Sequence, residues 1–148
     1  MAAVLGEIDR WFIVAIFRPL EQAGEPSSAI IAMMAEVRVY FRSGARICLV
    51  GSVGLVPARD IFIRQIQGYF SRWVSALVHC LEAGNVPAFQ AEALAEDAVS
   101  GIQGAIVLAR AMRDEAVFER IASRHETALL GALLDASCER RDEDRANC

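Results

Sequence analysis

The segment from residue 98 to residue 109 places the strongest constraint on what this chain can fold into. Only Ser100 and Gln103 are polar within it, and the other residues are alanine, valine, isoleucine, leucine and glycine. A surface helix usually carries one apolar stripe, whereas apolar residues here surround the helix axis. Such a helix has to be covered on two sides. We therefore expect one side to face its own domain and the other to face a second copy of the chain.

Apolar residues recur at steps of three and four along most of the remaining chain, which predicts further helices. Breaks at residues 23–26 and 84–87 combine glycine with proline, the residues that end one helix and open the next. No segment predicts a strand that has a partner strand. The sequence thus predicts an all-α, antiparallel bundle of about five helices, over residues 6–21, 27–42, 57 or 58 to 81, 87–112 and 114–136.

Two segments fit this pattern less well. Residues 43–57 are rich in glycine and β-branched residues, and we interpret them as a buried, glycine-interrupted helical turn. Residues 137–148 are charged and lack apolar anchors, which favours a frayed end. We therefore expect a helical domain over residues 1–136 and a charged flexible tail over residues 137–148.

Composition limits the possible functions. The 148 residues suit one domain, and 55% of them are hydrophobic, with a mean hydropathy of +0.33. That value requires either a very apolar core or an apolar surface covered by a partner. The net charge is -4 and no basic stripe is present, so the chain itself is a poor DNA binder. The apolar runs are shorter than the ~20 residues that cross a bilayer, and the N-terminus lacks a secretion signal, which predicts a cytoplasmic protein.

Catalytic and metal-binding patterns are weak. Ser52 is followed by a glycine two residues later, but Val50 stands where a nucleophile elbow needs another glycine. His79 and His125 have no patterned carboxylate, and His125 lies between charged neighbours that predict a solvated side chain. The four cysteines show no C-x-x-C spacing. We predict no enzymatic activity, no metal site and no cofactor.

Three segments, taken in order, resemble a known family. Residues 46–52 resemble a Gly-Cys-Leu-Leu-Gly-Asn element, although Arg46 and Ile47 stand in place of its glycine. Residues 69–73 followed by Leu77 resemble a long helix, and residues 98–111 resemble a penultimate helix with small residues before Leu-Ala-Arg-Ala. Together, over residues 11–134, they resemble the C-terminal regulatory domain of TetR/AcrR transcriptional repressors, in particular the LmrA/YxaF-like subgroup.

The resemblance implies an effector-sensing and dimerisation domain of a repressor. Members of the family begin with a helix-turn-helix domain that reads DNA, and this chain starts where the connecting helix would lie. We expect that reader to be missing here, so that DNA would be a partner only through it. A free-standing homodimeric small-molecule binder, or a helical interaction module, remains the alternative.

The resemblance also implies a homodimer in which the last two helices of each copy form a four-helix, isologous interface. Burial inside one chain is the alternative for each residue of this interface, and Phe118 and Ile121 suit both places. The residues expected at the interface are Val99, Ile102, Ile106, Arg110, Phe118, Ile121, Leu129 and Leu133.

The effector pocket is expected inside each protomer, among the first four helices. Methionine and aromatic side chains make adaptable apolar walls, and Gln103 offers a polar contact to a small, mostly apolar ligand. Helical spacing does not separate such a cavity from a filled core of the same residues. The expected lining is Trp11, Met33, Met34, Val37, Phe41, Phe62, Ile66, Phe70 and Gln103.

Overall fold

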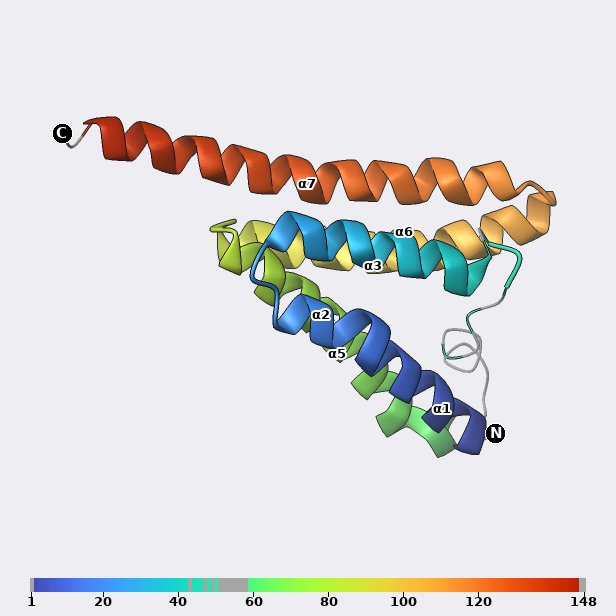
Figure 1. The fold of residues 1–148 in the computed structure, drawn as a ribbon. Helices are drawn as coiled ribbons and strands as arrows, with labels where there is room; N and C mark the ends of the chain where they lie inside the picture. The colour runs from blue at the N-terminus through green and yellow to red at the C-terminus, as the bar shows by residue number, and fades with distance from the viewer. Residues whose placement is uncertain (1, 43, 47, 49, 51–58, 147–148) are drawn as a thin grey trace.

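The computed structural model describes residues 2–42, 44–46, 48, 50 and 59–146. The N-terminal helix consists of α1 (Ala2–Phe12), a π-helical turn η1 (Ile13–Phe17) and α2 (Arg18–Glu21). The helices α3 (Pro26–Phe41), α5 (Arg59–Ala83), α6 (Ala88–Met112) and α7 (Glu115–Ala146) follow (Figure 1). These described parts of the chain contain no strand, and the prediction of an all-α bundle of about five helices is confirmed.

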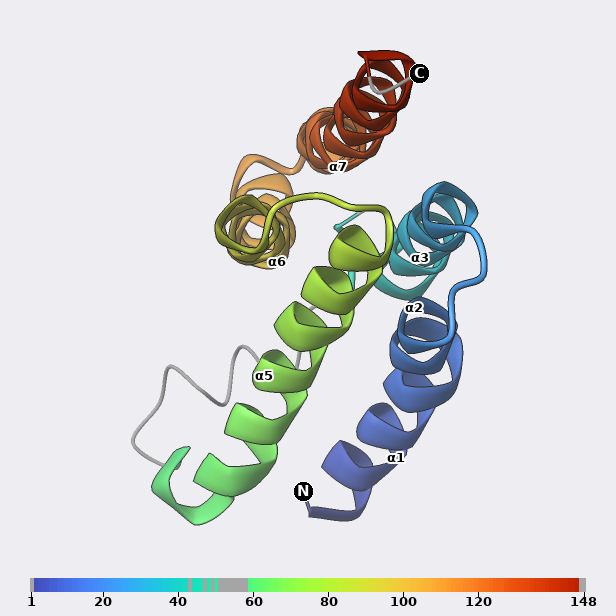
Figure 2. The ribbon, with the colours of Figure 1, turned by 90° about the vertical axis from the view of Figure 1, so that its left-hand side faces the viewer.

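The helices form two groups that cross at an angle. The helix α7 runs along both α6 and α3, whereas α5 packs on α6 and on the α1–α2 helix (Figure 1). The helices α1 and α5 run in the same direction, and both begin at the end of the molecule farthest from α7 (Figure 2). The N-terminus of α1 therefore projects away from the layer made by α3, α6 and α7.

Local chemistry explains where α3 begins and where the N-terminal helix changes its winding. The Glu25 carboxylate accepts hydrogen bonds from the amides of Ser27 and Ser28, at 3.1 and 2.6 Å, and so caps α3. Pro19 has no amide hydrogen to donate within the preceding helix. Just before it, the Arg18 amide bonds to the Ile13 carbonyl five residues back, which makes the π-helical turn η1.

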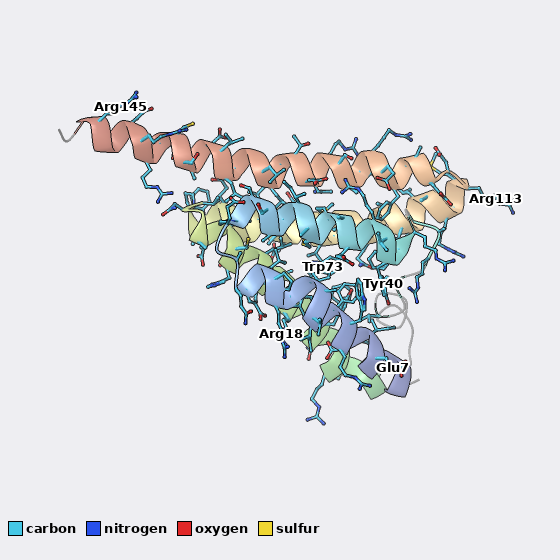
Figure 3. All side chains as sticks on the ribbon, in the orientation of Figure 1. Glu7, Arg18, Tyr40, Trp73, Arg113 and Arg145 are labelled. Atoms are coloured by element: carbon cyan, nitrogen blue, oxygen red, sulfur yellow. The ribbon has the colours of Figure 1, made fainter. Side chains whose placement is uncertain are left out.

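An aromatic cluster forms the centre of the core between the N-terminal helix and α5. The Phe12 ring lies 4.8 Å from Tyr69 and 5.5 Å from Trp73, measured between ring centroids, and Phe17 lies 6.0 Å from Tyr69. All four side chains are buried, and Trp73 lies in the interior between the two groups of helices (Figure 3). Offset and edge-to-face pairs of this kind add to the stabilisation that burial provides.

Part of the ambiguous segment after α3 can be placed. Residues 44–46 form a turn in which Gly44 has a φ of +92°. A Cβ at Gly44 would lie 2.7 Å from the Ala109 Cβ and 3.0 Å from that of Phe118, so only glycine fits there. Cys48 and Val50 are buried, as expected, but residues 51–57 of the predicted helical turn lie outside the described residues.

The predicted end of the last helix is wrong. We expected a helix end near residue 136 and a flexible tail, but α7 continues to Ala146. Residues 137–146 consist largely of glutamate, arginine and alanine, which favour helix, together with aspartate, and contain neither glycine nor proline. The side chains of residues 138–142 and of Arg145 are exposed (Figure 3). Lack of apolar anchors thus leaves the segment outside the core without ending the helix.

None of the described helices combines enough length with enough apolar character to cross a membrane.

Candidate ligand site and dimer surface

The residues expected to line the effector pocket divide into two groups. Met33, Met34, Val37 and Phe41 on α3 are at most 1% exposed and belong to the packed core. None of these four residues lines a cavity described below, and their place in an effector pocket stays a prediction.

The other expected pocket residues whose side chains are described are less buried than these four. Trp11 is half-buried and stacks on Tyr40, with 4.5 Å between ring centroids. Ile66 and Phe70 on α5 are half-buried, and the Phe62 side chain lies outside the described residues. Ile66 and Phe70 thus belong to α5, which packs on the N-terminal helix that carries Trp11.

Two side-chain nitrogen atoms, one on α5 and one on α6, are buried without a hydrogen-bond partner among the described residues. They are Trp73 Nε1 and Gln103 Nε2. An unpaired buried donor costs about 1–3 kcal/mol. A ligand with an acceptor group could remove this cost. Gln103 was expected as the polar contact, whereas Trp73 was missed because an indole in a helical apolar stripe looks like ordinary core.

Tyr69 is the third buried polar side chain in this region. Its hydroxyl lies beside the Cys48 thiol, and burial, followed by the effect of that thiol, raises the Tyr69 pKa well above its ordinary value. The phenol therefore stays protonated across the physiological range and can donate a hydrogen bond.

A cavity of about 300 Å³ opens between α1 and α5. Its apolar wall includes Val50, Ile66 and Tyr69, and its polar groups are Asp9, Arg64 and Arg72. Of the expected pocket residues whose side chains the structure describes, Ile66 is the one that lines this cavity. The Arg72 guanidinium is held by the Glu21 carboxylate of α2 through bonds of 2.9 and 3.0 Å. These bonds lower the pKa of Glu21.

Most residues expected at the dimer interface are buried inside the single chain. Exposure is 6% or less for six of the eight residues: Val99, Ile102, Ile106, Phe118, Leu129 and Leu133. Ile121 is half-buried, and Arg110 is exposed, where its Nη1 donates to the Ala45 carbonyl at 2.8 Å. The six buried residues therefore lie in the intrachain core, the alternative that the sequence left open, whereas Arg110 and Ile121 do not belong to it.

Other apolar side chains of α6 and α7 are exposed, those of α6 near its C-terminal end and Leu134 next to the residue that packs on Gly84. Val107, Leu108 and Met112 on α6 are 62%, 45% and 61% exposed, and Leu134 on α7 is 62% exposed. The helical glycines Gly104 and Gly131 are also on these two helices, and a Cβ at either would meet nothing within 4 Å. We call these six residues the outer face.

The helix α7 is held to α6 by close contact and to α3 by charge. A Cβ at Gly101 on α6 would collide with the imidazole of His125 on α7, so glycine allows the two helices to approach closely. The sequence predicted a solvated His125, but its side chain is half-buried, and burial lowers its pKa. On the other side of α7, the Arg38 guanidinium bonds to Glu119 at 3.0 Å and to Glu126 at 2.7 Å.

The family model described as "Transcriptional regulator LmrA/YxaF-like, C-terminal domain", a class of TetR C-terminal domains, matches residues 26–124. The chain belongs to this family. No curated protein and no solved structure matches the chain significantly.

The matched part of this LmrA/YxaF-like domain contains α3, α5, α6 and the beginning of α7. One wall of the α1–α5 cavity is thus inside the matched segment, and the other precedes it. Domains of this family regulate transcription by binding small molecules and by dimerising. Separately, the residues that the structure describes include no group of histidine, cysteine or acidic side chains that could hold a metal ion.

Proposed function

We propose that this chain is the effector-sensing and dimerisation domain of a cytoplasmic TetR-type repressor and has no enzymatic activity. The family match supports the regulatory class, and the outer face of α6 and α7 carries the dimerisation part of the proposal. With a net charge of -4, the domain is not suited to bind DNA itself. A helix-turn-helix segment joined to α1 would make the DNA contacts in such a repressor.

The dimer forms through the outer face rather than through the residues first expected there. One side of α6 is already covered by α5 and α7, and its other side leaves Val107, Leu108 and Met112 in solvent. Gly104 and Gly131 leave room for the backbone of another helix to come close. Two copies related by a two-fold axis would bury these residues in a four-helix contact, for which about 1,200–2,000 Å² is typical.

The test of this surface is the mass of two matched variants. A charge at an exposed apolar position of the outer face should separate the copies, because burying an unpaired guanidinium is costly. Light scattering should report about twice 16.2 kDa for the unmodified chain and a single 16.2 kDa chain for Val107→Arg. Val39→Arg on α3, which is equally apolar and 72% exposed, is the control and should remain dimeric. A dimeric Val107→Arg would rule out this surface.

Effector binding is proposed for the region between the N-terminal helix and α5, α6. The unpaired Trp73 and Gln103 donors and the cavity beside Ile66 support a small, mostly apolar ligand with at least one acceptor. Because α1 forms one wall of the cavity, an occupant would favour one position of α1 relative to α5. A thermal-shift screen of small apolar compounds tests this part, and the complete absence of stabilising compounds would count against it.

A further inference from the structure

We propose that the cavity between α1 and α5 binds a small carboxylic acid, whose apolar part lies against Ile66 and Val50 and whose carboxylate pairs with Arg64. This inference rests on the proposed sensing function and specifies the chemistry of its effector. It differs from the expected effector, which was mostly apolar, by requiring a negative charge.

Two glycines in the cavity wall lack any other structural reason. Gly6 lies within α1 and Gly68 within α5, and a Cβ at either position would meet nothing within 4 Å. Gly44, Gly84 and Gly101 differ, since a Cβ at each would collide with a neighbouring side chain. A glycine inside a helix costs about 1 kcal/mol relative to alanine. What Gly6 and Gly68 share is that both line the cavity, which a side chain on either would narrow.

The charges at the cavity favour an anion. Arg64 makes no ion pair or hydrogen bond among the residues that the structure describes. Arg72 binds Glu21 through Nε and Nη2, which leaves its Nη1 for another acceptor. Asp9 is the one carboxylate among the described lining residues, and Glu21 already pairs with Arg72, so Arg64 is the lining guanidinium that no carboxylate of the described residues binds. The planar guanidinium matches a carboxylate in geometry and charge.

The size and apolar surface of the cavity narrow the ligand class further. Its volume of about 300 Å³ is at the lower end of the range for small-molecule sites. The aliphatic side chains of Val50 and Ile66 and the Tyr69 ring provide an apolar wall. A phenylalkanoate or a short fatty acid fits this combination, whereas a highly polar metabolite would leave its hydrogen-bonding groups unpaired.

The experiment compares two probes that differ in charge. Isothermal titration calorimetry would measure binding of 4-phenylbutyrate and of neutral 4-phenylbutan-1-ol to the full chain. We expect the acid to bind about tenfold more tightly than the alcohol, a difference of about 1.4 kcal/mol. Arg64→Gln should abolish this preference and leave the affinity for the alcohol unchanged. Arg120→Gln on α7, also an exposed arginine, is the control and should behave like the unmodified chain.

Variants that fill the cavity provide the second arm. Gly6→Leu and Gly68→Leu should each prevent binding of both probes, while the thermal midpoint stays the same or rises because leucine favours helix. The proposal is overturned if neither probe binds at several times millimolar concentration, if Arg64→Gln keeps the preference for the acid, or if both leucine variants still bind. If one of these results is obtained while the chain is dimeric and is stabilised by apolar compounds, the carboxylate site is rejected but the proposed sensing function is retained.

Discussion

The Arg38 guanidinium on α3 bonds to three side chains of α7, and its removal gives a quantitative prediction. Arg38 Nε donates to Glu119 at 3.0 Å, and Nη2 donates to Glu126 at 2.7 Å and to the Ser123 hydroxyl at 3.3 Å. Burial acts to lower the Arg38 pKa, but the bonds and charges of Glu126 and Glu119 outweigh burial and raise it. Arg38→Met keeps most of the apolar stem and removes these bonds.

The exposure of each side chain sets the size of the effect. Arg38 and Glu126 are 24% and 20% exposed, so their bond is worth about 1.5–2 kcal/mol, the lower part of the range for bonds to charged groups. Glu119 is 41% exposed, and its pair adds less than about 1 kcal/mol. We therefore expect Arg38→Met to lower the free energy of unfolding by about 2 kcal/mol. For a chain of this size that lowers the melting temperature by roughly 4–8 °C.

Urea unfolding followed by circular dichroism measures this loss, at one protein concentration for all variants because dimerisation affects apparent stability. Arg120→Met is the control. Its Nη2 lies 3.6 Å from Asp114, and these side chains are 62% and 45% exposed, so we expect a change below about 0.5 kcal/mol. A double-mutant cycle with Glu126→Gln should give a coupling of about 1 kcal/mol. If the unfolding free energy of Arg38→Met lies within about 0.5 kcal/mol of that of the control, a difference typical of an exposed ion pair, the contact does not hold α7 in place.

Three further predictions follow from single contacts. Gly101→Ala should lower the free energy of unfolding by about 1–3 kcal/mol in the same assay, because the new methyl group collides with His125. Gly68→Ala, where a methyl group would meet open space, is the control and should be neutral or stabilising. Equal stabilities of the two variants would contradict the close approach of α6 and α7. The Cys80 thiol is buried, donates to the Pro26 carbonyl and has a pKa raised to about 11, so iodoacetamide at pH 8 should modify exposed Cys138 and leave Cys80 unmodified in the folded protein, as peptide mapping would show; rapid labelling of Cys80 would refute this. The Arg72 bonds lower the pKa of Glu21 from its ordinary 4.5, so they stabilise the fold above that pH and less as the pH falls through the lowered pKa; the stability difference between the unmodified chain and Arg72→Gln should shrink between pH 6 and pH 3, and a constant difference would show that the ion pair contributes nothing.

The helices could be predicted from the sequence because their signals are local. The Gly84 and Pro87 break gives the turn between α5 and α6, and the periodicity of apolar residues gives the length of every helix except α7 to within a few residues. The π-helical turn at η1 was missed, since Pro19 near the end of a helix predicts only that the helix stops or bends. The continuation of α7 was missed because the charged residues after position 136 were interpreted as a frayed end, whereas a charged sequence indicates only that the segment is exposed.

The site could be predicted only in outline, because its details depend on how the helices pack. The apolar surround of α6 shows that two sides are covered, but it does not show that Ile102 and Ile106 face inward while Val107 and Leu108 face outward. Likewise, Met33 and Met34 suit a cavity and a core equally well, and the structure places them in the core. Gly68 inside a strong helical pattern was a usable sign of the cavity that the sequence analysis did not use.

The most direct test of the account is the mass of the unmodified chain in solution, measured by sedimentation equilibrium over a range of concentrations. Apolar side chains left on the outer face of α6 and α7 predict a species of about twice 16.2 kDa that persists at micromolar concentration. A single species of 16.2 kDa at every concentration would contradict the account, because the outer face would then remain in water.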